Sequence, residues 1–76
     1  MNDRITIDAA VLLGKPVIRG TRMSVEFVVG LLAGGWSADD VVKEYGHITR
    51  DDVKACLAYA HQLLADDCLP HHAARP

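Results

Sequence analysis

Residues 36–53 read WSADDVVKEYGHITRDDV and contain two helix starts of the same design. Ser37 and Thr49 each suit the cap position, where a side-chain oxygen accepts a hydrogen bond from a free N–H of the first turn. An apolar residue precedes each cap and another follows it by four positions, an arrangement known as the hydrophobic staple. Asp40 and Asp52 add a weak capping box, because Asp is shorter than the preferred Glu. The stretch therefore predicts two capped helices.

The same stretch predicts a helix-turn-helix. The helices are expected near 38–45 and 50–66, joined by a tight turn in which Gly46 suits the left-handed residue that closes the first of them. In this motif the second helix enters the DNA major groove, and its first exposed residues reach base edges. Arg50 and Lys54 occupy those positions, whereas the two aspartates after Arg50 would meet phosphates unfavourably. A structural helical hairpin without a DNA role is the alternative.

Ser24 is a third cap and predicts a helix over 25–33, which Gly34-Gly35 ends. This helix is apolar on nearly every side, and Glu26 is its only charge. Such a helix needs covering all round, but two short helices and an arm can cover only one face. The remaining face is expected to meet a second copy or a partner. The interface candidates are Phe27, Leu31 and Tyr59.

The helix expected over 50–66 carries an apolar stripe that predicts its core-facing side. No cysteine spacing indicates a disulfide framework or a zinc site, and no nucleophile, base and orienting group converge. We therefore expect no enzyme activity, no cofactor and no metal site. The stripe consists of Val53, Cys56, Leu57, Ala60, Leu63 and Leu64.

The N-terminal quarter is expected to be extended and basic. Residues 4–8 alternate polar and apolar side chains, as a short strand does. An irregular arm over 13–22 follows and contains Val17-Ile18, which can pair with residues 5–7. Its basic side chains are expected to contact a phosphate backbone or an acidic partner, or else to pair internally with Asp8, Asp39 or Glu44. These basic residues are Lys15, Arg19 and Arg22.

Length and composition indicate one small domain, expected over 1–69 with a disordered tail over 70–76. The 76 residues are 50% hydrophobic and 24% charged, with a net charge of -2. Four basic and two acidic residues in 1–25 give +2, whereas four basic and eight acidic residues in 26–76 give -4. Contacts with anions should therefore lean on the N-terminal quarter. No apolar run reaches the roughly 18 residues of a membrane helix and no signal peptide is apparent, so the expected location is cytoplasmic.

Three segments resemble one known family. They are GKPVIRGTR at 14–22, AGGWS at 33–37 and ITRDDV at 48–53. The chain resembles a bacterial and archaeal domain-of-unknown-function family, number four-three-three, whose members are similar to antitoxins of the VapB type. The resemblance implies a mostly α-helical fold, namely a small homeodomain-like or winged helix-turn-helix domain of three helices, with a short N-terminal strand or hairpin arm. It transfers no catalytic residues.

The resemblance also implies an antitoxin that binds a PIN-like nuclease toxin and represses its own operon. Combined with the residues, it gives the expectation of a homodimer that binds operator DNA. Arg50 and Lys54 would face the groove, and Lys15, Arg19 and Arg22 the phosphate backbone. The alternative is a protein-binding module or structural homo-oligomer that does not bind DNA, which the acidic C-terminal two-thirds favours.

Overall fold

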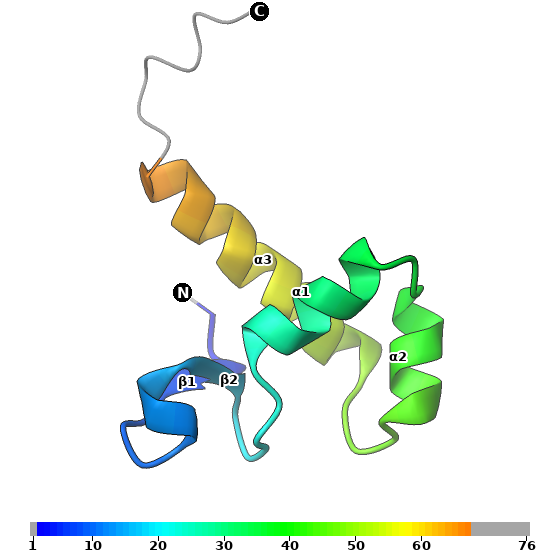
Figure 1. The fold of residues 1–76 in the computed structure, drawn as a ribbon, viewed down its shortest axis with the longest axis horizontal. Helices are drawn as coiled ribbons and strands as arrows, with labels where there is room; N and C mark the ends of the chain where they lie inside the picture. The colour runs from blue at the N-terminus through cyan, green and yellow to red at the C-terminus, as the bar shows by residue number, and fades with distance from the viewer. Residues whose placement is uncertain (1, 68–76) are drawn as a thin grey trace, which may run out of the picture.

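The computed structural model describes residues 2–67, which form three helices beside a two-stranded hairpin (Figure 1). A 3-10 turn, η1 (Leu12–Gly14), connects the strands. This architecture confirms the mostly α-helical domain with an N-terminal hairpin, and each helix lies within one residue of its predicted bounds. The tail predicted over 70–76 lies outside the described residues. The elements are β1 (Ile5–Ile7), β2 (Pro16–Ile18), α1 (Val25–Ala33), α2 (Ala38–Glu44) and α3 (Arg50–Asp67).

All three helices begin at the predicted caps. Ser24 accepts a hydrogen bond of 2.9 Å from a first-turn N–H of α1. The Ser37 hydroxyl accepts from the Asp40 N–H at 3.0 Å, and the Asp40 carboxylate accepts from the Ser37 N–H at 2.9 Å. Thr49 and Asp52 exchange the same two bonds at the start of α3. The shorter Asp therefore closes a complete capping box twice, and the bonds from Ser37 lower the pKa of the Asp40 carboxyl.

The turn between α2 and α3 differs from its prediction at Gly46. Within residues 2–67 the glycines with positive φ are Gly14, Gly20 and Gly35, so the predicted left-handed conformation of Gly46 is wrong. α2 ends at Tyr45 instead, whose N–H donates to the Val41 carbonyl at 2.8 Å and whose carbonyl accepts from the Ile48 N–H at 3.0 Å. Because Tyr45 itself turns the chain at φ -117° and ψ 74°, no left-handed residue is needed.

The hairpin forms within one chain and closes one side of the core. β1 and β2 are antiparallel with Ile5 opposite Ile18, which confirms the predicted pairing of Val17-Ile18 with residues 5–7. The Ile18 N–H donates to the Met23 carbonyl at 2.9 Å, so the segment that leads into α1 is bonded to the other edge of β2. Ile5 and Ile18 are both buried in the core.

One core lies between the three helices and the hairpin. Val28 of α1, Val41 of α2 and Cys56 of α3 are completely buried in it. The apolar residues of all three predicted staples belong to this cluster or pack against it, so the devices that start the helices also place them around one centre. None of the helices in residues 2–67 has the length and apolar character needed to cross a membrane.

The apolar stripe of α3 is only half covered. Val53 and Cys56 are buried, but Leu57, Leu63 and Leu64 are 46%, 52% and 61% exposed, so the expectation that the whole stripe faces the core is wrong. α3 has 18 residues against 9 in α1, and its C-terminal half runs past the bundle (Figure 1). Leu57 lies beside the bundle, but it is turned about 100° around the helix axis from Cys56 and so reaches solvent.

Candidate nucleic-acid interface

Asp52, one of the two acids that argue against groove insertion, points into the molecule. Only 9% of it is exposed, and its carboxylate accepts from the Thr49 N–H at 2.9 Å and from Arg4 Nη1 at 3.0 Å. Burial alone would raise the pKa of this carboxyl, but the hydrogen bonds from Thr49 and Arg4 outweigh burial and hold the pKa below its ordinary value. Asp51 stays exposed, 3.7 Å from the same guanidinium. Arg4 therefore neutralises part of the acidic helix start.

Arg4 is the residue that reasoning from the sequence missed. It directly precedes β1 and is separated from Asp52 by 48 positions in the chain. The alternation of residues 4–8 places Arg4 at the end of a strand, but it does not reveal which helix that strand packs against. The sequence shows only a single basic residue next to a predicted strand. Such residues are too common to indicate which acid Arg4 contacts.

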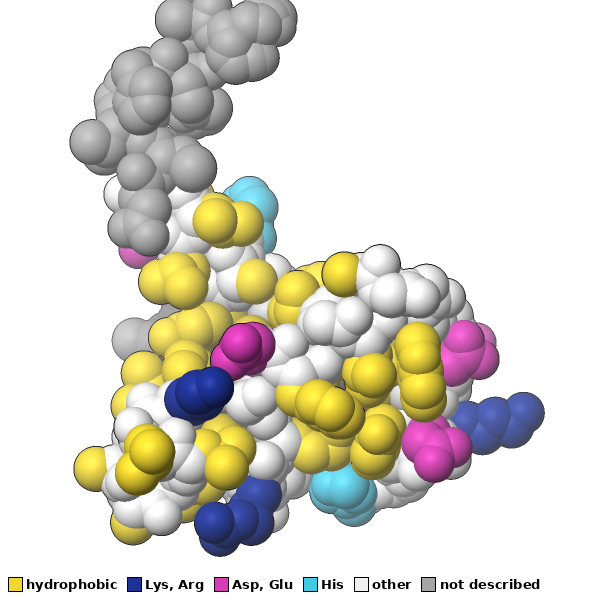
Figure 2. Space-filling model, viewed as in Figure 1, with side chains coloured by type: hydrophobic (Ala, Val, Ile, Leu, Met, Phe, Trp, Pro, Cys, Tyr) yellow, Lys and Arg dark blue, Asp and Glu magenta, His cyan; other side chains and the backbone are white. Residues whose placement is uncertain are grey.

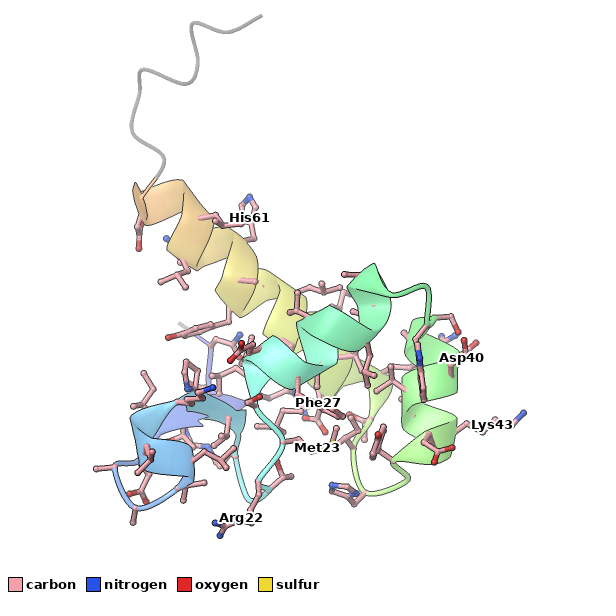
Figure 3. The ribbon with its side chains drawn as sticks, viewed as in Figure 1. Arg22, Met23, Phe27, Asp40, Lys43 and His61 are labelled. Carbon is pink, nitrogen blue, oxygen red and sulfur yellow. The ribbon has the colours of Figure 1, made fainter. Side chains whose placement is uncertain are left out.

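An exposed ridge runs along α3 and consists of Arg50, Lys54, Leu57 and His61, here named the outer ridge. These residues follow one another at intervals of three or four and so share one side of the helix. Figure 3 shows His61 directed away from the bundle. Arg50 pairs with Asp39 of α2 at 2.6 Å, yet both side chains are about 70% exposed. Such a pair contributes little stability, so Arg50 can exchange Asp39 for a phosphate at small cost.

The basic side chains of the arm have separate surroundings. Lys15 contacts Glu26 at 2.9 Å, and Arg19 Nε donates to the Asp3 carbonyl at 2.8 Å. Arg22 points away from the bundle in the loop before α1 (Figure 3) and forms no ion pair with any residue of the described range 2–67. The internal pairing suggested with other acids does not form. Those acids are Asp8, Asp39 and Glu44.

Two grooves separate the predicted DNA contacts from one another. One, of about 550 Å³, runs between η1 and α1 and has Phe27 in its wall. The other, of about 1110 Å³, lies between β1 and α3, and Asp3, whose carbonyl Arg19 holds, lines it. The five predicted contacts thus fall into two groups: Lys15 and Arg22 line the groove beside α1, whereas Arg19, Lys54 and Arg50 lie on the side of β1 and α3.

Phe27 belongs to an aromatic group that bridges α1 and α2. Its ring meets Tyr45 edge-on at 5.7 Å, and Tyr45 stacks on Trp36 at 6.3 Å. Phe27 nevertheless remains 44% exposed, and Leu31 is half-buried. Hydrophobic side chains cover much of this side of α1 and α2 (Figure 2). We name this surface, made of Phe27, Leu31, Trp36 and Tyr45, the aromatic face.

Tyr59, the third interface candidate, lies elsewhere. It is half-buried in the groove between β1 and α3, where Ile7 is 59% exposed. Phe27 and Tyr59 therefore belong to two separate apolar surfaces, the aromatic face and the β1–α3 groove. Phe27, Leu31 and Tyr59 were predicted together because all three are apolar. Phe27 and Leu31 lie on α1, however, and Tyr59 lies on α3, so they face different sides of the molecule.

Cys56 is confirmed as a core residue. Burial, together with the nearby charge of Asp52, raises the pKa of its thiol to about 11, so the thiol stays protonated at neutral pH. Among residues 2–67 no group of three His, Cys, Asp or Glu side chains is arranged to hold a metal ion.

Comparison with known proteins places the chain in a family. None of the curated proteins matches it. The crystal structure of a DUF433 member protein from Anabaena variabilis ATCC 29413 is similar, with a TM-score of 0.76 and 28% sequence identity. The similar region covers 79% of this chain and 59% of that one, so this chain spans well under two thirds of its solved relative. A family model described as "Protein of unknown function (DUF433)" matches residues 5–60, and the chain belongs to this family.

Proposed function

We propose that this protein is the antitoxin of a type II toxin–antitoxin pair, a helix-turn-helix homodimer that binds a PIN-like nuclease toxin and its own operator DNA. The observation that supports DNA binding most directly is the inward direction of Asp52. With Asp52 held by Arg4, the exposed charges of the first turns of α3 are Arg50, Asp51 and Lys54, so two cations stand beside one acid there. The toxin partner is proposed from the family resemblance and from the exposed aromatic face.

The separation of the basic residues suggests a division of roles. Arg50 and Lys54 would reach base edges, and Arg19, beside the same groove as Lys54, would contact a flanking phosphate. Lys15 and Arg22 line the groove that contains Phe27. We assign these two cations to acidic side chains of the toxin at the edge of the aromatic face.

DNA binding is tested with the promoter of the native operon in a salt series. Affinity should fall steeply with salt, because each phosphate contact releases a counterion. Lys54→Ala should weaken binding to the operator and relax specificity at the base that Lys54 contacts. Lys43→Ala is the matched control, since Lys43 is exposed on α2 and is not a proposed contact (Figure 3). Absence of binding at low salt, or affinity that does not change with salt, refutes the DNA role.

Toxin binding is tested by co-expression with the product of the adjacent gene. The two proteins should co-purify, and the nuclease should be inactive in the complex. Phe27→Lys should abolish co-purification, because it places a charge on the aromatic face. Leu63→Lys introduces the same charged residue in the exposed C-terminal half of α3 and should leave the complex intact. Failure of the wild-type proteins to co-purify contradicts the antitoxin role.

A protein-binding module without DNA binding is the second candidate. It is favoured by the acids exposed around the helix-turn-helix, because they would repel phosphates. Arg50, a proposed base contact, is already paired with one of them. In that case the toxin complex would form, while promoter DNA would stay unbound at every salt concentration. The acids are Asp39, Asp40, Glu44 and Asp51.

A further inference from the structure

We propose that two copies of this chain join through the outer edge of β1, so that their hairpins form one four-stranded sheet in the order β2-β1-β1-β2. The inference rests on the homodimer of the proposed function and names the surface that forms it. It depends on three observations: the hydrogen-bonding groups that β1 leaves unused, a self-complementary sequence, and the groove beside the strand.

β1 has a hydrogen-bonding edge that its own hairpin does not use. The Arg19 N–H donates to the Arg4 carbonyl at 2.7 Å, and hydrogen-bonded positions alternate along an antiparallel pair. The register therefore turns the backbone of Thr6 toward β2 and that of Ile5 and Ile7 away from it. In the described part of the chain these outward groups make one hydrogen bond, a long one of 3.4 Å from the Ile5 N–H to the preceding turn. Such an edge is a template for another strand.

The sequence of the strand is complementary to itself in one antiparallel register. When two copies of residues 4–8, RITID, are centred on Thr6, Ile5 lies opposite Ile7 of the second copy. The outward N–H and C=O groups of these residues then meet as hydrogen-bonded pairs. The same register places Arg4 opposite Asp8 of the second copy at both ends, and opposite charges across strands stabilise a pair. A shift by one residue would lose both matches.

Arg4 and Asp8 can both still form this ion pair between the two copies. Arg4 uses its Nη atoms on Asp51 and Asp52, but a guanidinium carries five N–H donors and its side chain is half exposed. Asp8 is exposed, and one of its oxygens accepts from the Ala10 N–H at 2.9 Å. Its second carboxylate oxygen is available to the guanidinium of the second copy.

The groove beside β1 offers a place for the side chain of Ile7. Ile7 is 59% exposed, and it shares a face of the strand with the buried Ile5. The groove next to Ile5 has Ala55, Ala58 and Tyr59 of α3 in its wall. In the proposed register Ile7 of the second copy stands beside Ile5 and enters this groove. Each copy thereby covers an apolar side chain that would otherwise remain in water.

Thr6→Cys tests the register directly. Thr6 would face Thr6 of the second copy as a non-hydrogen-bonded pair with Cα atoms about 4.5 Å apart, which is within the range that a disulfide bridges. We expect Thr6→Cys, in a Cys68→Ser background, to form a covalent dimer in a glutathione redox buffer. Leu13→Cys in the same background is the control, since Leu13 is 97% exposed on a different segment. Equal cross-linking of the two variants overturns the proposal.

Ile7→Lys tests the groove without a cross-link. Sedimentation should show the dissociation constant of the dimer rising at least about tenfold, because a lysine would enter an apolar groove. Leu13→Lys, which makes the same exchange elsewhere, should leave the constant unchanged. A wild-type protein that is monomeric at about 100 µM, or an Ile7→Lys dimer as tight as wild type, overturns the proposal. Neither measurement contains DNA or toxin, so the dimer surface and the antitoxin role can fail separately.

Discussion

Asp52 joins the start of α3 to the N-terminal strand. Its carboxylate accepts hydrogen bonds from the Thr49 N–H and from Arg4, so one side chain completes a helix cap and fixes the hairpin on the bundle. Because its pKa is lower in the folded protein, its ionised form stabilises the fold. This contribution is fully present above the unfolded pKa of about 3.9 and is lost as the pH falls through the folded pKa.

We expect Asp52→Asn to lower the free energy of unfolding by about 1–2 kcal/mol near pH 7, since Arg4 loses its charged partner. Urea unfolding at pH 7 and at about pH 2 should show the difference between wild type and variant narrowing in acid, where the carboxyl is protonated. Asp66→Asn is the control on an exposed acid and should change stability little. A difference of the same size at both pH values would contradict this role for Asp52.

Leu13 is unfavourable both in its backbone conformation and in its exposure. Its φ is +56°, a left-handed conformation that costs a non-glycine residue about 1–2 kcal/mol, and its side chain is 97% exposed. Asn tolerates this conformation better, so Leu13→Asn should raise the free energy of unfolding by up to about 1 kcal/mol. Leu64→Asn, the same exchange within a helix, should lower it slightly. Equal urea midpoints for Leu13→Asn and wild type would show that the turn stores no strain.

The secondary structure could be predicted from the sequence where local chemistry determines it. Ser24, Ser37 and Thr49 fix the three helix starts through bonds to residues three positions away, so the helix bounds followed from short spacings. The end of α2 did not, because Tyr45 can close the turn as well as a left-handed glycine does. Which part of the stripe on α3 is covered depends on where the neighbouring helices stop, as Leu63 and Leu64 show.

The sequence predicted which residues belong to the candidate site, but not how these residues are arranged in space. Lys15, Arg50 and Lys54 are exposed, yet the partners of Lys15 and Arg50 lie 11 positions away on neighbouring elements. The contact of Arg4 with Asp52 spans 48 positions. Charge counts along a chain do not encode such tertiary pairings, so the sequence could not show that the basic residues fall into two groups.

Because only part of α3 is buried, shortening its apolar side chains should lower the free energy of unfolding by different amounts along the helix. Val53→Ala removes buried methyl groups and should cost about 1–3 kcal/mol of unfolding free energy. Leu64→Ala, on the exposed end of the same helix, should change stability by less than about 0.5 kcal/mol. Both values are measured by urea unfolding of the isolated protein. A cost for Leu64→Ala close to that for Val53→Ala would mean that the end of α3 is covered in solution.

The two apolar surfaces lie on different elements. The aromatic face extends from α1 to α2, whereas the other surface lies between β1 and α3. A small domain rarely leaves two such surfaces open unless each has a partner. Lys15 and Arg22 line the groove that contains Phe27, and Ile7 belongs to the self-complementary strand β1. The aromatic face therefore has two cations at its border, whereas β1 has a cation before it and an acid after it.

This division predicts that the two associations can be removed one at a time. Phe27→Lys should abolish co-purification with the toxin while the dimer persists in sedimentation, because Phe27 does not line the β1–α3 groove. Ile7→Lys should give the reverse result, a monomer that still binds toxin. Both side chains are at least 44% exposed, so each variant should fold with a helical circular dichroism spectrum like that of wild type. If either substitution removes both associations, the two surfaces act as one, and the toxin must contact the dimer across the hairpin.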